Sequence, residues 1–137
     1  MEAKDNQDVR SVLGSFQGRM DADFQSALER TGARLFHLRG ESVSTKTEFL
    51  DRIAELMDFP DYFGRNWDAL EDCLTDLAWI DAPAVVLVYD RTGNFAQNSP
   101  EDWAIALDVL RSTESYWTGK TSSAFHLILQ EDVVVSD

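Results

Sequence analysis

Three short apolar segments, separated by stretches with helical periodicity, most constrain how this chain can fold. They are RLFHLRG at 34–40, AVVLVYD at 84–90 and FHLILQ at 125–130, and each is rich in large apolar or β-branched residues. Strands that are joined through helices pair in parallel, with right-handed crossovers. The sequence therefore predicts an α/β fold with a three-stranded parallel sheet packed with helices.

Capping signals predict the helices between these strands. The run TKTE at 45–48 is a capping-box pattern, and the helix that it opens should end near 59–60. Asn66 is the expected N-cap of a second helix, and SPED at 99–102 should open a third that ends before Gly119. The apolar side of the second helix is predicted to contain Trp67, Leu70, Cys73, Leu74 and Leu77.

One more helix is predicted upstream of the first strand, over 21–30, because apolar residues recur there at helical spacing. Residues 1 to about 15 are interpreted as a frayed tail, and 94–99 as a polar loop. We accordingly divide the chain into an N-terminal extension at 1–33 and a domain at 34–137.

Composition limits the classes of partner. The chain has 137 residues, is 44% hydrophobic and carries a net charge of −13, so it should fold as one domain and repel nucleic acid and anionic membranes. A cationic protein is the better match, and salt should slow the encounter. The N-terminus lacks a signal-peptide pattern and the longest apolar run, at 82–89, is too short to span a bilayer, which predicts a cytoplasmic protein.

The negative charge is concentrated between 58 and 81, where seven acids accompany one cation, Arg65. Asp68, Asp72 and Asp76 follow one another at intervals of four, so they would share one face of a helix. Like charges at that spacing cost an isolated helix about 0.2–0.5 kcal/mol per pair. An ordinary solvated helix face and a surface for a cationic partner both account for this row. The seven acids are Asp58, Asp61, Asp68, Glu71, Asp72, Asp76 and Asp81.

Three chemistries could use such a row. The carboxylates could meet Arg and Lys of another protein, with Tyr62 as an aromatic anchor. They could bind Mg²⁺ for hydrolysis, although acids in line along a helix do not form a cage, or act as a general acid and base, which would need a pocket. One cysteine, Cys73, and two histidines, His37 and His126, exclude a disulfide within the chain and the usual zinc clusters, so no cofactor is predicted.

The run from Phe59 to Leu77, FPDYFGRNWDALEDCLTDL, closely resembles the signature of the barstar family. The resemblance extends from about Arg34 to Gln130, and the order strand, two helices, strand, helix, strand agrees with it. It implies a non-catalytic inhibitor that inserts this helix and the loop before it into the active site of a basic ribonuclease. Carboxylates would then take the place of RNA phosphates, most simply in a 1:1 complex of monomers.

The resemblance also implies roles for individual residues. Tyr62 matches the tyrosine that packs over the catalytic histidine of the nuclease, and Asn66 matches the asparagine at the helix start. Asp68 and Asp72 match two aspartates that meet arginines and lysines of the enzyme, with Asp72 the central one. Gly64 matches a glycine that lets the loop approach its target closely.

Several positions depart from barstar, the namesake of the family. Glu71 replaces a tryptophan and Asp76 replaces a glycine, and both are included in the predicted partner-binding surface. The family's further acid on the third helix has no secure counterpart, because Ser112 occupies its position and Glu114 lies only nearby. A nuclease toxin domain, for which this chain would be the immunity protein, therefore fits as well as a barnase-type enzyme.

Overall fold

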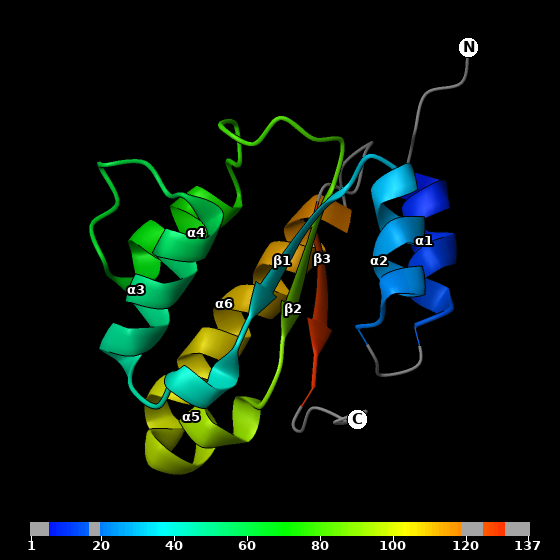
Figure 1. Ribbon diagram of the computed structural model, residues 1–137. Coiled ribbons are helices and arrows are strands. Elements are labelled where there is room, and N and C mark those ends of the chain that lie inside the picture. The colour runs from blue at the N-terminus through cyan, green and yellow to red at the C-terminus, as the bar shows by residue number, and fades with distance from the viewer. Residues whose placement is uncertain (1–5, 17–19, 119–124, 131–137) are drawn as a thin grey trace.

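The sheet has three parallel strands in the order β1–β2–β3 (Figure 1). The computed structural model describes residues 6–16, 20–118 and 125–130. Strand β1 is Arg34–Leu38, β2 is Val85–Tyr89 and β3 is Phe125–Leu129. Val85 pairs with Arg34 on one side and with Phe125 on the other. The predicted α/β fold with a three-stranded parallel sheet is confirmed.

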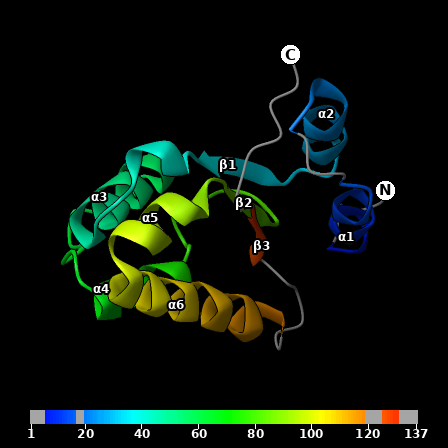
Figure 2. The ribbon, with the colours of Figure 1, turned by 90° about the horizontal axis from the view of Figure 1, so that it is seen from below.

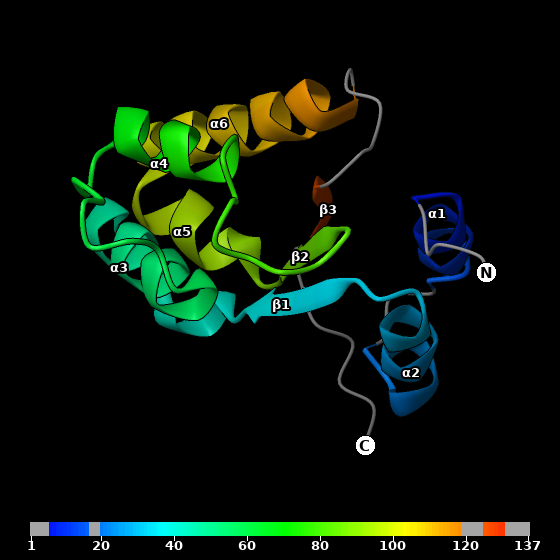
Figure 3. The same ribbon diagram turned by 90° about the horizontal axis from the view of Figure 1, so that it is seen from above.

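Helices cover both faces of this sheet and form three layers with it (Figures 2 and 3). The two N-terminal helices lie on one face, and the remaining helices lie on the other. Their bounds are α1 Asn6–Gly14, α2 Ala22–Arg30, the 3₁₀ turn η1 Gly40–Ser42, α3 Lys46–Met57, α4 Trp67–Leu74, α5 Thr92–Asn98 and α6 Pro100–Thr118. No helix in the described ranges is both long and apolar enough to cross a membrane.

The central strand β2 is buried on both faces, and its alternating side chains enter two separate cores. One core lies under α3 to α6 and is rich in aromatic rings. The other lies under α1 and α2 and contains smaller aliphatic groups together with Phe24 and Leu28. Val85, Leu87 and Tyr89 of β2 enter the first core. Val86 and Val88 enter the second core, together with Ala84, which directly precedes the strand.

Most predicted helix ends agree with the structure. The Thr45 hydroxyl accepts a hydrogen bond from the Glu48 amide at 3.1 Å and caps α3. That helix ends at Met57, earlier than the predicted 59–60, because Asp58 adopts a left-handed conformation with φ 57°. Helix α6 ends at Thr118, as expected from the sequence.

Two segments that were predicted to be irregular are helical. Residues 6–14 of the expected frayed tail form α1, which buries Val9 against the sheet to 1% exposure. The remainder of that tail prediction, at 1–5, lies outside the described residues. The expected polar loop at 94–99 is mostly helix α5, which buries Phe95 completely. In both segments a few apolar residues provide the packing that stabilises the helix, despite polar neighbours.

Candidate protein-binding surface

The outer side of α4 carries a compact group of carboxylates. Asp68, Glu71 and Asp72 are exposed, while Leu70 and Leu74 on the opposite side are buried in the first core. Helical spacing of three and four residues places the three acids together on one face. We refer to Asp68, Glu71 and Asp72 as the α4 acidic face.

Asp76 does not extend this row along the helix as predicted. Helix α4 ends at Leu74, and Asp76 lies in the turn that follows, where its amide bonds the Cys73 carbonyl at 3.1 Å. Leu77, expected on the apolar side of the helix, also lies beyond its end but is buried, with φ 55°. The helix has already ended at that point, and the left-handed residue changes the direction of the chain after it.

A short, constrained turn sets the start of α4. Asn66 caps the helix, because its side-chain Oδ1 accepts a hydrogen bond from the Ala69 amide at 2.7 Å. Arg65, just before it, adopts a left-handed conformation with φ 57°. A Cβ at Gly64 would lie 3.3 Å from the Asn66 side-chain nitrogen, so a larger residue there would press on the cap. Asn66 is confirmed as the N-cap, and Gly64 gives it room.

The one cation of the acidic region is directed away from the α4 acidic face. Arg65 Nη1 donates to Asp51 Oδ1 of α3 at 2.6 Å, in an exposed ion pair. Lys46 lies over the Trp67 ring, with Nζ 5.3 Å from the ring centre. In the part of the chain that the structure describes, no salt bridge neutralises any acid of the α4 acidic face. This face therefore presents uncompensated negative charge to solvent.

Tyr62 provides an exposed aromatic ring beside this charge. Its side chain is 69% exposed, and its hydroxyl donates a long hydrogen bond of 3.4 Å to Asp76 Oδ2. Partial desolvation and the Asp76 carboxylate raise the pKa of Tyr62 above its usual value, so the phenol remains neutral at physiological pH. The structure thus brings Tyr62 and Asp76 together, although fourteen positions separate them in the sequence.

The surface rests on a rigid support. Trp117 Nε1 of α6 donates to the Leu74 carbonyl at 2.8 Å, and Trp79 Nε1 donates to the Met57 carbonyl at 2.9 Å. Cys73 is 1% exposed, and its burial raises the pKa of the thiol. The nearby carboxylates of Asp72 and Asp76 raise it further. Cys73 is therefore a packing residue, because a buried protonated thiol is a poor nucleophile.

The two candidates for a further acidic contact on α6 behave differently. Ser112 is exposed, whereas Glu114 is half-buried and its Oε2 accepts a hydrogen bond from the Leu127 amide of β3 at 3.2 Å. Glu114 therefore satisfies a backbone donor of the last strand and is not directed toward a partner. Sequence reasoning could not detect this bond, which joins positions on a helix and a strand.

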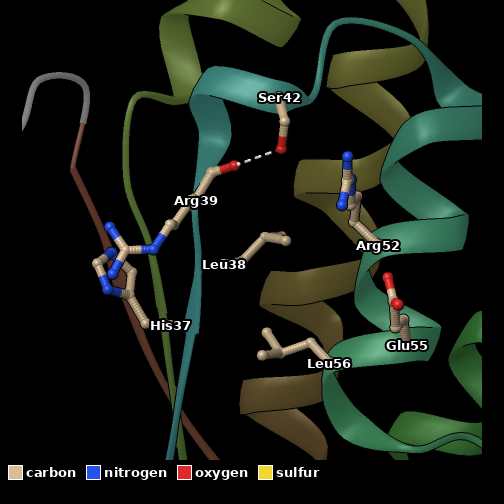
Figure 4. Close-up of a pocket in the computed structure, with 7 residues that line it drawn as sticks. All are labelled: His37, Leu38, Arg39, Ser42, Arg52, Glu55 and Leu56. Carbon is tan, nitrogen blue, oxygen red and sulfur yellow. Dashed lines mark hydrogen bonds between the residues drawn. The ribbon is translucent and has the colours of Figure 1, made fainter.

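Sequence reasoning also missed a pocket of about 250 Å³ between the end of β1 and α3 (Figure 4). Nearby, His37 Nε2 lies 2.5 Å from Asp90 Oδ2, and the Gly40 amide donates to Asp90 Oδ1 at 2.8 Å.

Within the described ranges no three His, Cys, Asp or Glu side chains are grouped so that they could hold a metal ion. The α4 acidic face is thus a row of carboxylates and not a coordination cage.

Comparisons with known proteins agree with this architecture. The family model described as Barstar (barnase inhibitor) matches residues 33–130, which contain the whole sheet and helices α3 to α6. The Bacillus subtilis (strain 168) protein named "Putative ribonuclease inhibitor YrdF" is 50% identical over 66 residues, which cover 47% of this chain and 67% of that relative. The match to the family model spans well over half of the sequence, and the chain belongs to the barstar family.

Proposed function

We propose that this chain inhibits a basic ribonuclease by covering its active site with α4 and the loop before it. The family description names a barnase inhibitor, and the Bacillus relative is named as a ribonuclease inhibitor. The observation that carries the proposal is the α4 acidic face. Its carboxylates are exposed, and none of them forms a salt bridge within the residues that the structure describes. Such a face gains most from a partner that supplies guanidinium and ammonium groups.

Each residue has a distinct proposed part in this contact. Asp72, midway along the exposed side, is the central acceptor for arginine and lysine groups of the enzyme, and Asp68 accepts beside it. Tyr62 packs its exposed ring against the active site. Glu71 and Asp76 extend the negative charge toward the rim, where they speed encounter more than they hold the complex.

Gly64 and Asn66 act on the shape of the surface. The Asn66 cap fixes the first turn of α4, and Gly64 leaves space for that cap. The Trp117 bond to Leu74 holds the other end of the helix. Because both ends are fixed before binding, little conformational entropy should be lost when the complex forms.

The test is titration of ribonuclease activity with the native chain, with Asp72→Asn and with the control Glu29→Gln. Glu29 is an exposed acid on α2, on the opposite side of the sheet, so its replacement removes one charge without touching the surface. Two enzymes are needed, a barnase-type guanyl-specific ribonuclease and a nuclease toxin domain encoded beside the chain. Ribonuclease activity should be fully inhibited when one equivalent of the native chain has been added.

We expect Asp72→Asn to weaken inhibition by about 2 kcal/mol or more, the usual threshold for an interface hot spot, while Glu29→Gln changes it little. Association should slow as salt rises. Which enzyme is inhibited identifies the target class. Equal, weak binding of many basic proteins by all three chains would refute the proposal and indicate an unspecialised acidic module.

A further inference from the structure

Strand β1 has an open edge. In the described part of the chain β1 pairs only with β2, so one side of its backbone lacks a neighbouring strand. The Arg34 amide bonds the Ala84 carbonyl at 2.9 Å, and the Leu38 carbonyl accepts from the Asp90 amide at 3.2 Å. Because backbone groups alternate in direction along a strand, those of Leu35 and His37 point to the open edge.

The pocket of about 250 Å³ lies along this edge. Figure 4 shows Leu38 of the strand and Leu56 of α3 directed toward each other across it. The Arg52 side chain lies on the α3 side, whereas the Arg39 side chain extends past the other side of the strand, next to His37. One arginine therefore flanks each face of the open edge, with apolar groups between strand and helix.

These arginines are unusual in a chain with a net charge of −13. Arg65 and Arg91 form ion pairs with nearby acids, but neither Arg39 nor Arg52 has a salt bridge in the described ranges, although both are exposed. Glu55 also lines the pocket without pairing with Arg52. The edge thus offers two exposed cations without a salt bridge in the described ranges, on a chain whose net charge is negative. Arg52 also interacts electrostatically with the Glu48 carboxylate, one turn earlier on α3.

We propose that this edge binds an extended acidic segment of another protein, which adds to the sheet beside β1. Side chains of an added strand would alternate between the two faces, so its acids could reach Arg52 on one face and Arg39 on the other. An apolar side chain on the first face would enter the space between Leu38 and Leu56. The surface is separate from the α4 acidic face, and the proposal does not depend on ribonuclease inhibition.

The probe is a blocked, fluorescently labelled hexapeptide of sequence Glu-Val-Glu-Glu-Val-Glu, which places acids and valines on both faces of a strand. Two analogues accompany it, one with Gln for every Glu and one with alternate backbone amides methylated. Binding to the full chain is followed by fluorescence anisotropy at low salt. Amide signals of Leu35 and His37 are followed by NMR.

We expect the acidic peptide to bind and to shift the amide signals of Leu35 and His37. The double variant Arg39→Gln/Arg52→Gln should weaken binding about tenfold, because two charged contacts are lost. Arg111→Gln is the matched control, since Arg111 is an exposed arginine of α6 without a salt bridge in the described ranges. Both analogues should bind much more weakly than the probe.

Several results would overturn the proposal. Undiminished binding of the methylated analogue would show attraction by charge without strand pairing. An equal loss in Arg111→Gln would show that the edge is not the site. No binding of the probe would mean that the arginines only discourage edge-to-edge aggregation, a common use of charged edge residues. A concentration-dependent dimer that shifts the amide signals of Leu35 and His37 in the absence of peptide would assign the edge to a second copy of the chain.

Discussion

The two faces of the sheet differ in what packs on them and in what that packing supports. On one face, aromatic side chains such as Phe49 stack with Tyr89 at 5.8 Å and with Phe95 at 5.6 Å between ring centres, beneath the helices that present the α4 acidic face. On the other face, α1 and α2 cover Val86 and Val88 with a smaller cluster. Both faces are covered by helices, but only the first carries the proposed inhibitory surface.

This difference separates stability from recognition. The family match begins at residue 33, so α1 and α2 lie outside it, yet they bury one whole face of β2. We propose that these helices fold as part of the same cooperative unit and contribute to stability without touching the nuclease. The division into an extension at 1–33 and a domain at 34–137 would then describe the sequence family and not an independent folding unit.

The largest expected effects come from matched leucines in the two cores. Leu70 of α4 and Leu28 of α2 are both fully buried, so each change to alanine should lower the free energy of unfolding by about 2–5 kcal/mol. Urea unfolding measures both values. Inhibition, compared per folded molecule, should weaken in Leu70→Ala, whose cavity lies under the α4 acidic face, and stay native in Leu28→Ala.

The comparison fails if Leu28→Ala loses inhibition as strongly as Leu70→Ala when both chains are folded. The second face would then affect the position of α4 through the sheet. A small stability loss in Leu28→Ala would contradict the proposed single cooperative unit, because a separately folding α1–α2 pair could open without unfolding the domain.

Matched helix caps test the same comparison with smaller changes. Asp21 caps α2 by accepting from the Phe24 amide at 2.9 Å, much as Asn66 caps α4. Replacing either residue with alanine should cost about 1 kcal/mol in unfolding free energy. Only Asn66→Ala should also weaken ribonuclease inhibition, because it loosens the first turn of the acidic face. Equal inhibition by both variants would remove Asn66 from the proposed surface.

The arrangement of strands was predictable from sequence because hydrophobic periodicity and capping are local signals. The segment Val85–Tyr89 is apolar throughout and Arg34–Leu38 contains Leu35, Phe36 and Leu38. Thr45 and Asn66 mark helix starts by residue type alone. Helix α1 was not predicted, because its isolated sequence is polar and its stability depends on burial of Val9 against the sheet. Tertiary packing outweighs weak propensity there.

The candidate surface was only partly predictable for a similar reason. Spacing placed Asp68 and Asp72 on one helical face, but it could not show that the helix ends at Leu74, before Asp76. Two pairings also depend on the fold, the Arg65 bond to Asp51 and the Glu114 bond to β3. Contacts between distant positions leave no periodic trace in a sequence.

Tyr89 gives the smallest and most local test of the two faces. It is the one β2 side chain with a polar group on the aromatic face, and its buried hydroxyl has no hydrogen-bond partner in the described ranges. Tyr89→Phe should therefore raise the free energy of unfolding by about 1 kcal/mol at neutral pH. The control Tyr62→Phe, at an exposed site, should change it by less than about 0.5 kcal/mol.

The pH dependence of Tyr89→Phe tests whether burial of the hydroxyl is the cause of the gain in stability. Burial, and secondarily the Asp90 carboxylate, raise the pKa of Tyr89 well above its ordinary value of 10.0. Above about pH 10 the unfolded chain loses this proton while the native state keeps it, so native stability falls by about 1.4 kcal/mol per pH unit from this group. Below that pH the group contributes no slope. Urea unfolding between pH 8 and 11 should show the advantage of Tyr89→Phe constant at first and then growing, whereas a constant difference throughout would mean that water reaches the hydroxyl.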